Sequence, residues 1–426
     1  MTHIDHANLV HDTMKSFNDT NTNIMTPIIL VRYMVRMKID SYKRNSLSNE
    51  PVKVIDRHCG RGTYLIEAVA YLMEGDFLKS RFPNEQDRCR YIVENEIYGA
   101  DICPVMCALT KSALEQFCGY YNVKNLKLNI KNVDSLFKNV DSLLYNWGME
   151  FEINVGNPPY QATAGYKTSA DFEDVDGKYG KKQLYYYFTK LGIEQMSHDG
   201  ILSLVMPKCW QTSDDGSKLR LWLRSQNIEL TNFPIPEGGE FVGVMTDANI
   251  QVFKRNLTNS PSQFHGPNAI YTTTDWQRAW LDAVEAGHTL TANRGGFKEV
   301  EGLPLITTYD KYKRGVTTST RPVAPLKTDA ERLIVLPEFL APFRNNFEKA
   351  IIVEAAPFSD GFIGIYVNKH SAASILKWIQ SEQFFKAMSW LKGSSHGGSL
   401  CQYFITEEAF NKYVKEYYEA EERIPH

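Results

Sequence analysis

The spacing of hydrophobic residues in the first half of the chain alternates between two patterns. Short apolar runs, typical of buried strands, are separated by longer segments in which apolar residues recur as they do along one face of a helix. The pattern predicts strands at 52–56, 97–101, 126–133, 151–155, 201–206 and 248–253, and helices at 62–72, 104–117, 184–196 and 217–225. Strands that alternate with helices indicate parallel strands joined by right-handed crossovers.

This alternation stops near residue 255. Residues 256–268 are rich in Asn, Ser, Thr and Pro, which is typical of a linker. Beyond them the chain has short apolar pieces and one longer helical pattern at 372–391. We therefore expect a Rossmann-like α/β domain over 1–255, with helices on both faces of its sheet, a linker over 256–268, and an α+β domain over 269–426.

Composition narrows the class of protein. The formal net charge is −3, so binding to nucleic acid would need a local basic face rather than an overall positive charge. The chain has no apolar run long enough for a membrane span, and its polar first residues do not resemble a signal peptide. The seven cysteines follow no pairing framework, and Cys103 and Cys107 lack a second pair of ligands for a metal. We expect a cytoplasmic protein with free thiols and no metal site.

Polar residues follow the ends of four predicted strands. They are Asp56, Asp101, Asp134 and Asn157. Ligands of open parallel sheets bind beyond the carboxyl ends of the strands. The sequence therefore predicts that these four side chains line one site at one edge of the sheet.

The first strand end has the pattern of a cofactor-binding turn. Gly60 and Gly62 follow Asp56 directly and precede a helix, and glycines allow a tight turn and a close approach of a ligand to the backbone. Asp101, at the end of the next strand, can accept hydrogen bonds from two ribose hydroxyl groups. A dinucleotide site would need a third glycine, which is missing here. An acidic turn instead suits a cofactor that carries positive charge. Asp56 would solvate the amino group of such a cofactor, and Asp134 would accept a hydrogen bond from the amino group of its adenine.

The most specific motif is Asn157-Pro158-Pro159-Tyr160. The Asn157 side-chain oxygen and the Pro158 carbonyl can accept both hydrogens of a planar amino group. This would draw the nitrogen toward tetrahedral geometry and free its lone pair for attack on a methyl donor. The prolines hold the two acceptors in place beforehand, and Tyr160 offers an aromatic face on which a base can stack.

These motifs resemble the amino-methyltransferases of DNA, in particular the N6-adenine class with the gamma order of motifs. The segment from Asp56 to Thr63 is similar to the family's cofactor motif, Thr26-Pro27 to the motif that precedes it, and 153–160 to its catalytic strand and tetrapeptide. Arg57 and His58 stand where the family has proline and a small residue. The resemblance implies S-adenosylmethionine as cofactor, bound by these residues: Thr26, Pro27, Asp56, Cys59, Gly60, Gly62, Asp101, Ile102 and Asp134.

The same resemblance implies double-stranded DNA as substrate, with the target base flipped out of the helix and resting on Pro159 and Tyr160. The loop at 161–182, with Tyr166 and Phe172, would close over the base. By its position, the C-terminal third is expected to be a target-recognition domain. Its basic cluster Lys311, Lys313 and Arg314, with lysines of the 161–182 loop, supplies candidate phosphate contacts.

Other functions remain open from the sequence. The tetrapeptide also occurs in methyltransferases that act on guanine N2 in RNA and on glutamine in proteins, and a non-catalytic DNA-binding subunit could keep the same fold. A nicotinamide oxidoreductase is disfavoured by the missing third glycine. We expect no nuclease activity in this chain, and the sequence leaves open whether a separate restriction endonuclease is its partner.

Overall fold

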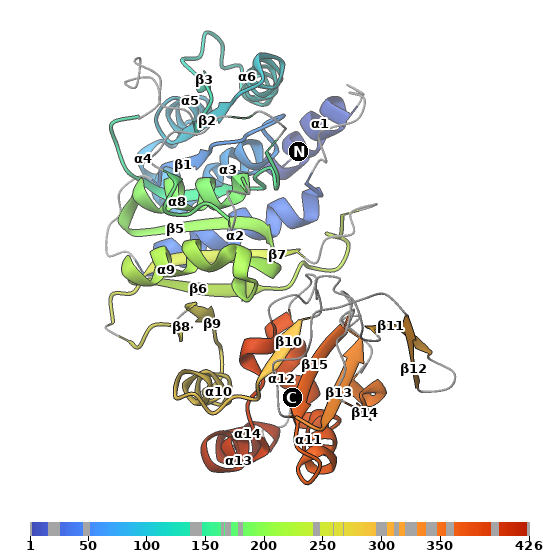
Figure 1. Cartoon of the computed structure of the whole chain (residues 1–426). Coiled ribbons are helices and arrows are strands. Elements are labelled where there is room, and N and C mark those ends of the chain that lie inside the picture. Colours follow the sequence, from blue (N-terminus) through green and yellow to red (C-terminus); the bar gives the residue numbers. More distant parts are fainter. Residues whose placement is uncertain are drawn as a thin grey trace. The chain divides into compact units, whose positions relative to one another are not determined.

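The computed structural model describes most of the chain in two compact units, shown in Figure 1. The described residues are 2–15, 26–45, 52–136, 147–162, 166, 172–177, 182–241, 248–258, 260–266, 268–294, 305–310, 315–319, 330–337, 347–354, 362–392 and 400–423. The first unit is formed by Met1–Pro207 and Trp222–Ser262, and the second by Lys208–Leu221 and Gln263–His426.

A seven-stranded sheet forms the centre of the first unit, in the order β3-β2-β1-β4-β5-β7-β6. Its strands are β1 (Val54–Asp56), β2 (Ile97–Asp101), β3 (Asn129–Asn132), β4 (Phe151–Gly156), β5 (Met196–Pro207), β6 (Ile228–Phe233) and β7 (Ala248–Arg255). The strands β1 to β5 pair in parallel, whereas β7 runs antiparallel to both β5 and β6. The predicted α/β class with a mostly parallel sheet is confirmed.

Helices cover both faces of this sheet. They are α1 (His3–Lys15), α2 (Ile28–Asn45), α3 (Thr63–Met73), α4 (Asp76–Arg81), α5 (Glu85–Asn95), α6 (Pro104–Gly119), α8 (Leu184–Glu194) and α9 (Ser217–Ser225). In the view of Figure 1, α8 lies in front of β5 and α2 lies behind the strands. The central strands are buried on both faces, as their continuous apolar runs predict.

Three elements of the first unit differ from the pattern-based expectation. The polar stretch 73–96 contains α4 and α5, whose described buried residues are few because the rest of each helix faces solvent. The pattern missed β6 altogether. The strand predicted at 248–253 is β7, and β6, which comes directly before it, pairs with it antiparallel from Ile228 to Phe233.

A buried ion network fixes the N-terminal helices on α3. Glu67 of α3 accepts hydrogen bonds from Arg32 of α2, Nε to Oε2 at 2.9 Å and Nη2 to Oε1 at 2.7 Å. His11 of α1 lies on the other side, with Nε2 3.2 Å from Oε1 of Glu67. Arg61, in the turn before α3, donates to the carbonyl of Met14 near the end of α1. These contacts position α2, and with it Thr26 just before its first turn.

The second unit is built around a four-stranded antiparallel sheet in the order β10-β15-β13-β14. Its strands are β8 (Phe264–His265), β9 (Ile270–Tyr271), β10 (Ala292–Arg294), β11 (Leu305–Asp310), β12 (Gly315–Ser319), β13 (Arg332–Pro337), β14 (Ile351–Glu354) and β15 (Phe362–Val367). Its helices are α10 (Asp275–Glu285), α11 (Ala372–Ile379), α12 (Glu382–Lys392), α13 (Glu407–Ala409) and α14 (Lys415–Glu422).

Aromatic residues form much of the hydrophobic core of the second unit. Trp280 and Trp378 are buried and stacked 6.4 Å apart, and their indole N–H groups donate to the carbonyls of Tyr403 and Ile405. The single helix predicted at 372–391 is instead two helices. The break occurs because Ser381 Oγ accepts from the Phe384 N–H and so starts α12 anew.

The division into two units differs from the sequence-based one in one detail. The segment Lys208–Leu221 clusters with the second unit, although the sequence places it in the first. Buried Arg220 accounts for this, because it donates to the carbonyls of Trp210, Ser213 and Asn268. The units divide at Ser262, inside the segment taken as the linker. None of the helices in the described part of the chain is long and apolar enough to cross a membrane.

Replacing Glu67 with glutamine should destabilise the protein by about 1–3 kcal/mol, because Arg32 then loses its charged partner. Burial works to raise the pKa of Glu67, but the hydrogen bonds from His11 and Arg32 outweigh it and keep the pKa below its ordinary value. The stabilisation is thus present above the carboxyl's unfolded pKa and is lost on acidification. Urea unfolding measures the change. Exposed Glu74 is the control, and equal midpoints for Glu67→Gln and Glu74→Gln would contradict the prediction.

Candidate functional site

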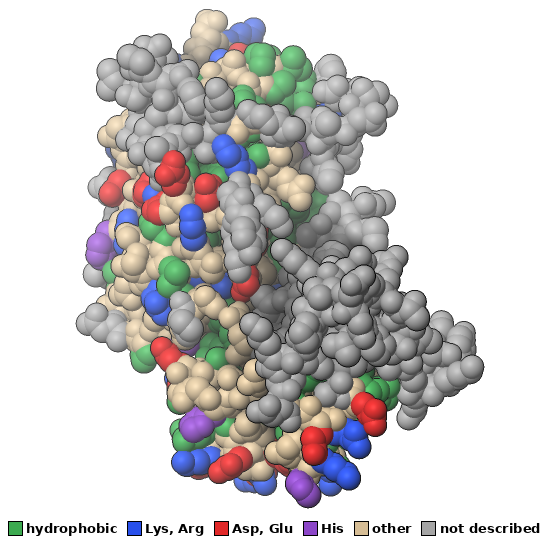
Figure 2. Space-filling model, in the orientation of Figure 1, with side chains coloured by type: hydrophobic (Ala, Val, Ile, Leu, Met, Phe, Trp, Pro, Cys, Tyr) green, Lys and Arg blue, Asp and Glu red, His purple; other side chains and the backbone are tan. Residues whose placement is uncertain are grey.

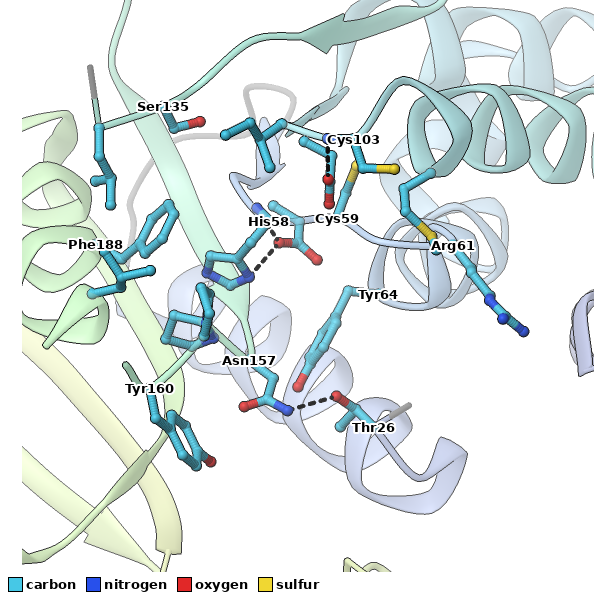
Figure 3. A pocket seen from close by; sticks show the side chains of 18 of the residues that line it. Thr26, His58, Cys59, Arg61, Tyr64, Cys103, Ser135, Asn157, Tyr160 and Phe188 are labelled. Carbon is cyan, nitrogen blue, oxygen red and sulfur yellow. Dashed lines mark hydrogen bonds and ion pairs between the residues drawn. The ribbon is translucent and has the colours of Figure 1, made fainter. Parts of the chain in front are cut away.

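A pocket of about 580 Å³ opens at the carboxyl ends of the parallel strands in the first unit, as Figure 3 shows. It lies where the sequence predicts a site. The residues that line it are Thr26, Asp56, His58, Cys59, Arg61, Thr63, Tyr64, Asp101, Ile102, Cys103, Met106, Asp134, Ser135, Leu136, Asn157, Pro158, Pro159, Tyr160, Tyr166, Leu184, Phe188 and Phe241.

Most of the predicted site residues meet in this pocket, but some do not. Pro27 does not line it: its carbonyl instead accepts the Val31 N–H in the first turn of α2. Gly60 and Gly62 shape the turn below the pocket without lining it. The predicted phosphate contacts Lys311, Lys313 and Arg314 lie outside the described residues.

The glycine turn requires glycine at both positions. Gly60 has φ of 53° and Gly62 has φ of 82°, a backbone region that other residues rarely adopt. A Cβ at Gly62 would also lie 2.9 Å from Cγ2 of Thr110 in α6. Thr110 in turn donates from Oγ1 to the Gly60 carbonyl at 2.8 Å. The turn is therefore held between the start of α3 and the body of α6.

Asp101 ties this turn to the end of β2. Its Oδ2 accepts the Gly60 N–H at 2.9 Å and its Oδ1 accepts the Cys103 N–H at 2.8 Å. Each carboxylate oxygen keeps a second acceptor position, so Asp101 can still receive hydroxyl groups from a ligand. Next to it, Ile102 lines the pocket with its side chain 62% exposed, an apolar surface open to a flat ring.

Asp134 is already engaged. Its Oδ1 accepts the Leu136 N–H at 2.9 Å, and the hydroxyl of Tyr166 lies 2.9 and 3.1 Å from its two oxygens. A ligand amino group at Asp134 would share these oxygens with Tyr166. Tyr166 is thus placed beside Asp134, a position that its place in a long loop did not reveal.

Phe172 does not contribute to the pocket, contrary to the expectation that it would cover a base. It is buried and packs on Tyr187 of α8, with ring centroids 5.2 Å apart. The burial of this large apolar ring against α8 keeps it away from the pocket. Of the loop lysines, Lys182 donates to the Tyr166 carbonyl, and Lys167, Lys178 and Lys181 lie outside the described residues.

The amide of Asn157 is oriented by α2. Its Nδ2 donates to Oγ1 of Thr26 at 3.2 Å, as the dashed line in Figure 3 shows. This leaves Oδ1 as the free end of the amide, and that oxygen is buried with no hydrogen-bond partner among the described residues. A buried acceptor without a donor is costly, and such atoms are often reserved for a ligand. The structure therefore presents a preformed acceptor for an N–H or O–H group.

Aromatic rings stand near this acceptor. Tyr160 lines the pocket and meets Tyr185 edge to face, with centroids 5.9 Å apart. Burial raises the pKa of Tyr160 to about 12, so its hydroxyl stays neutral. Phe241, from the segment after β6, also lines the pocket. The sequence pattern did not single out Phe241, because it stands alone in a glycine-containing segment without periodicity.

The two unusual residues after Asp56 point in different directions. Arg57 is buried away from the pocket, over the ring of Phe151 and hydrogen-bonded to Gln195. His58 instead lines the pocket, and its Nδ1 lies 3.1 Å from Oδ1 of Asp56. Burial raises the pKa of Asp56 to about 8, with a smaller contribution from Asp101, and burial lowers the pKa of His58 to about 3. Both groups are therefore largely neutral at pH 7.

No group of metal-ligating side chains occurs among the described residues. Cys59 lines the pocket, and burial raises its thiol pKa well above the ordinary value. It is therefore protonated and is a poor nucleophile. The buried, protonated thiol therefore disfavours thiolate catalysis at this pocket.

Gly156, where β4 ends, is the position in the site with the least room for a side chain. A Cβ there would lie 2.1 Å from Cε1 of His58 and 2.8 Å from Oδ1 of Asp56. Gly156→Ala should therefore cost about 1–3 kcal/mol of overpacking in addition to about 1–2 kcal/mol for its positive φ. Gly148, with φ of 64° and open space around it, reports the cost of a positive φ without crowding, although in a different backbone region from Gly156. Urea unfolding compares the two variants, and equal losses of stability would show that the crowding is not real.

Comparisons with known proteins agree with this architecture. Residues 95–234 match the model of the Eco57I restriction-modification methylase family. Among curated proteins, no match was found. The ATP-dependent Type ISP restriction-modification enzyme LlaBIII, solved bound to DNA, aligns with a TM-score of 0.56 and 10% identity over 92% of this chain and 39% of its own. This likeness concerns the fold.

Two further solved structures are similar over smaller parts of this chain. One is a putative class I S-adenosylmethionine-dependent methyltransferase from Listeria monocytogenes, with a TM-score of 0.42 and 13% identity over 62% of this chain and 72% of its own. The other is the M protein of the Type I restriction enzyme EcoKI, with a TM-score of 0.40 and 18% identity over 60% and 52%. This chain spans less than half the length of the Type ISP enzymes that it resembles, 39% of LlaBIII and 23% of LlaGI.

Proposed function

We propose that this protein transfers a methyl group from S-adenosylmethionine to the N6 amino group of adenine in DNA. The observation that carries the proposal is the buried, unpartnered Oδ1 of Asn157 in the strand-end pocket. The match of residues 95–234 to a restriction-modification methylase family supports it, because that segment contains the tetrapeptide.

The pocket suits a cofactor with positive charge. Two carboxyl groups, Asp56 and Asp101, line it, and the Gly60 N–H that could bind an anion already donates to Asp101. A pyrophosphate would find this backbone donor already taken, with two carboxyl groups beside it. When bound, S-adenosylmethionine supplies an electrophilic methyl group. Asp101 would receive its ribose hydroxyls, Ile102 would pack against its adenine, and Asp56 would face its ammonium group.

The chain's own residues would activate the amino group by holding it. Asn157 Oδ1 and the Pro158 carbonyl accept its two hydrogens, and Thr26 keeps the amide from turning its Nδ2 toward the substrate. Positioning of two reactants can lower a barrier by roughly 7–11 kcal/mol, so no strong base is needed. The amino proton leaves to water after transfer. Tyr160 and Phe241 offer aromatic surfaces for the base.

Adenine in a duplex is reached only after it flips out of the helix, at a cost of a few kcal/mol. Contacts to phosphates must offset this cost. We assign DNA contacts to the C-terminal residues 269–426 as a target-recognition domain, with Lys311, Lys313 and Arg314 as candidates. LlaBIII, which shares the fold and was solved with DNA, makes this substrate more plausible than RNA or protein.

The substrate class is tested by incubating the protein with S-adenosylmethionine labelled in its methyl group and with DNA, RNA or protein. We expect label in DNA, and N6-methyladenine after digestion to nucleosides. Label in guanine of RNA or in glutamine would establish an alternative that uses the same clamp. Absence of cofactor binding at high concentration would instead favour a non-catalytic DNA-binding subunit.

Asn157→Ala should lower methyl transfer at least about a hundredfold, because the oriented acceptor is lost. Binding of the cofactor, measured by calorimetry, should change little, since Asp56, Asp101 and the glycine turn stay intact. The matched control is Asn95→Ala, an exposed asparagine of α5. Turnover of Asn157→Ala near the wild-type rate would refute the clamp.

Cofactor affinity should rise with pH from about 6 to about 7.5, below the range where an α-amino group loses its own proton. Burial holds the pKa of Asp56 at about 8 in the free protein. A cationic ligand favours the carboxylate and lowers that pKa, so binding releases a proton below pH 8 and affinity increases with pH over this range. Calorimetry in buffers of different ionisation enthalpy measures the protons released. Asp56→Asn should abolish this proton release. If the release is unchanged in that variant, the proton comes from a group other than Asp56.

A further inference from the structure

His58 occupies the base of the pocket without a role in the clamp. Its backbone N–H donates to Oδ1 of Asp56 at 3.1 Å, and its ring Nδ1 lies 3.1 Å from the same oxygen. Its ring also meets Phe188 edge to face, with centroids 4.7 Å apart. Figure 3 shows the ring between Phe188 and Asn157. Only 10% of the side chain is exposed, so these contacts fix the imidazole.

The two oxygens of Asp56 have different surroundings. Oδ1 accepts the backbone N–H of His58, and the ring Nδ1 of His58 lies 3.1 Å from it but forms no hydrogen bond with a described residue. No described residue forms a hydrogen bond with Oδ2. Because Asp56 is 1% exposed and lines the pocket, its free oxygen can meet only a group inside the pocket. The orientation of the carboxyl group is therefore set from the His58 side.

We propose that His58 is a positioning residue that holds Asp56 for the ammonium group of the cofactor and keeps it in place when the carboxyl group changes its protonation state. This rests on the proposed function of the pocket. The Nδ1 atom can accept a hydrogen bond from a protonated carboxyl group and, in the other tautomer, can donate one to a carboxylate. A small apolar residue at this position could do neither.

The charged and titratable groups around Asp56 are few, and this makes the histidine important. Asp101 on β2 acts on Asp56 as a like charge, and Tyr64 of α3 and Cys59 of the turn are neutral at ordinary pH because burial raises both pKa values. Arg57 acts on His58 from the opposite side of the strand and disfavours a charge on its ring. A neutral imidazole, which can take either tautomer, fits this environment better than a cationic side chain.

A purely structural role is the alternative, since the ring also packs on Phe188. Two substitutions separate the roles. His58→Asn keeps a polar group near the position of Nδ1 but loses the ring, whereas His58→Phe keeps an aromatic ring beside Phe188 and loses the nitrogen. Thermal unfolding of both variants establishes that they are folded before binding is compared.

The test uses two ligands by calorimetry: S-adenosylhomocysteine, which has the ammonium group, and 5′-methylthioadenosine, which lacks it. We expect His58→Phe to weaken the binding of S-adenosylhomocysteine about tenfold and that of 5′-methylthioadenosine less than about twofold. The variant His58→Asn should keep most of the affinity that His58→Phe loses. In turnover, His58→Phe should raise KM for the methyl donor while kcat changes little. In an Asp56→Asn background, His58→Phe should have no further effect on binding.

Equal affinities of wild type and His58→Phe for S-adenosylhomocysteine would overturn the positioning role. So would an equal loss for both ligands, which would indicate a collapsed pocket. Either result would leave the proposed function standing. If the wild-type protein itself bound neither ligand, the proposed function would fail first, and the role of His58 with it.

Discussion

The close approach between the ends of β1 and β4 is the constraint on which the site depends. Position 156 has no room for a Cβ, because Asp56 and His58 fill the space beside it. This contact places the acidic end of β1 directly against the strand that leads into Asn157. One ligand can therefore reach both the cofactor side and the acceptor side of the pocket. The glycine turn and α2 then complete the two halves, through Asp101 and Thr26 respectively.

Much of this arrangement could be predicted from the sequence, because strand ends in a parallel sheet converge. The order of the strands up to β4 follows from apolar spacing, and Asp56, Asp101, Asp134 and Asn157 indeed line one pocket. What the spacing could not reveal is contact between distant segments. The partner of Asn157 is Thr26, 131 residues away, and the partner of Asp134 is Tyr166. Phe172 was placed wrongly, since nothing in a polar loop signals which aromatic ring will be buried.

The elements that escaped prediction share a physical cause. The helices α4 and α5 bury few of their residues, so their periodicity is weak. The strand β6 lies at the sheet edge, with Thr231 exposed and Glu229 only partly buried among its residues, and it lacks the continuous apolar run of β4. In the second unit, Ser381 interrupts an apolar pattern that is continuous by itself. The spacing of apolar residues indicates which side chains are buried. It does not predict a helix or strand correctly where burial is partial or where a local hydrogen bond interrupts the element.

The part of the chain that matches a methylase family starts at residue 95 and leaves the glycine turn outside. Arg57 and His58, which depart from the motif that this turn resembles, also lie outside the matched residues. The geometry accommodates both: Arg57 leaves the pocket to lie over Phe151, and His58 packs into the space that Gly156 provides. Two buried groups that would be costly as an ion pair, Asp56 and His58, remain largely neutral in the free protein. A cationic ligand beside Asp56 would offset the cost of ionising this buried carboxyl group.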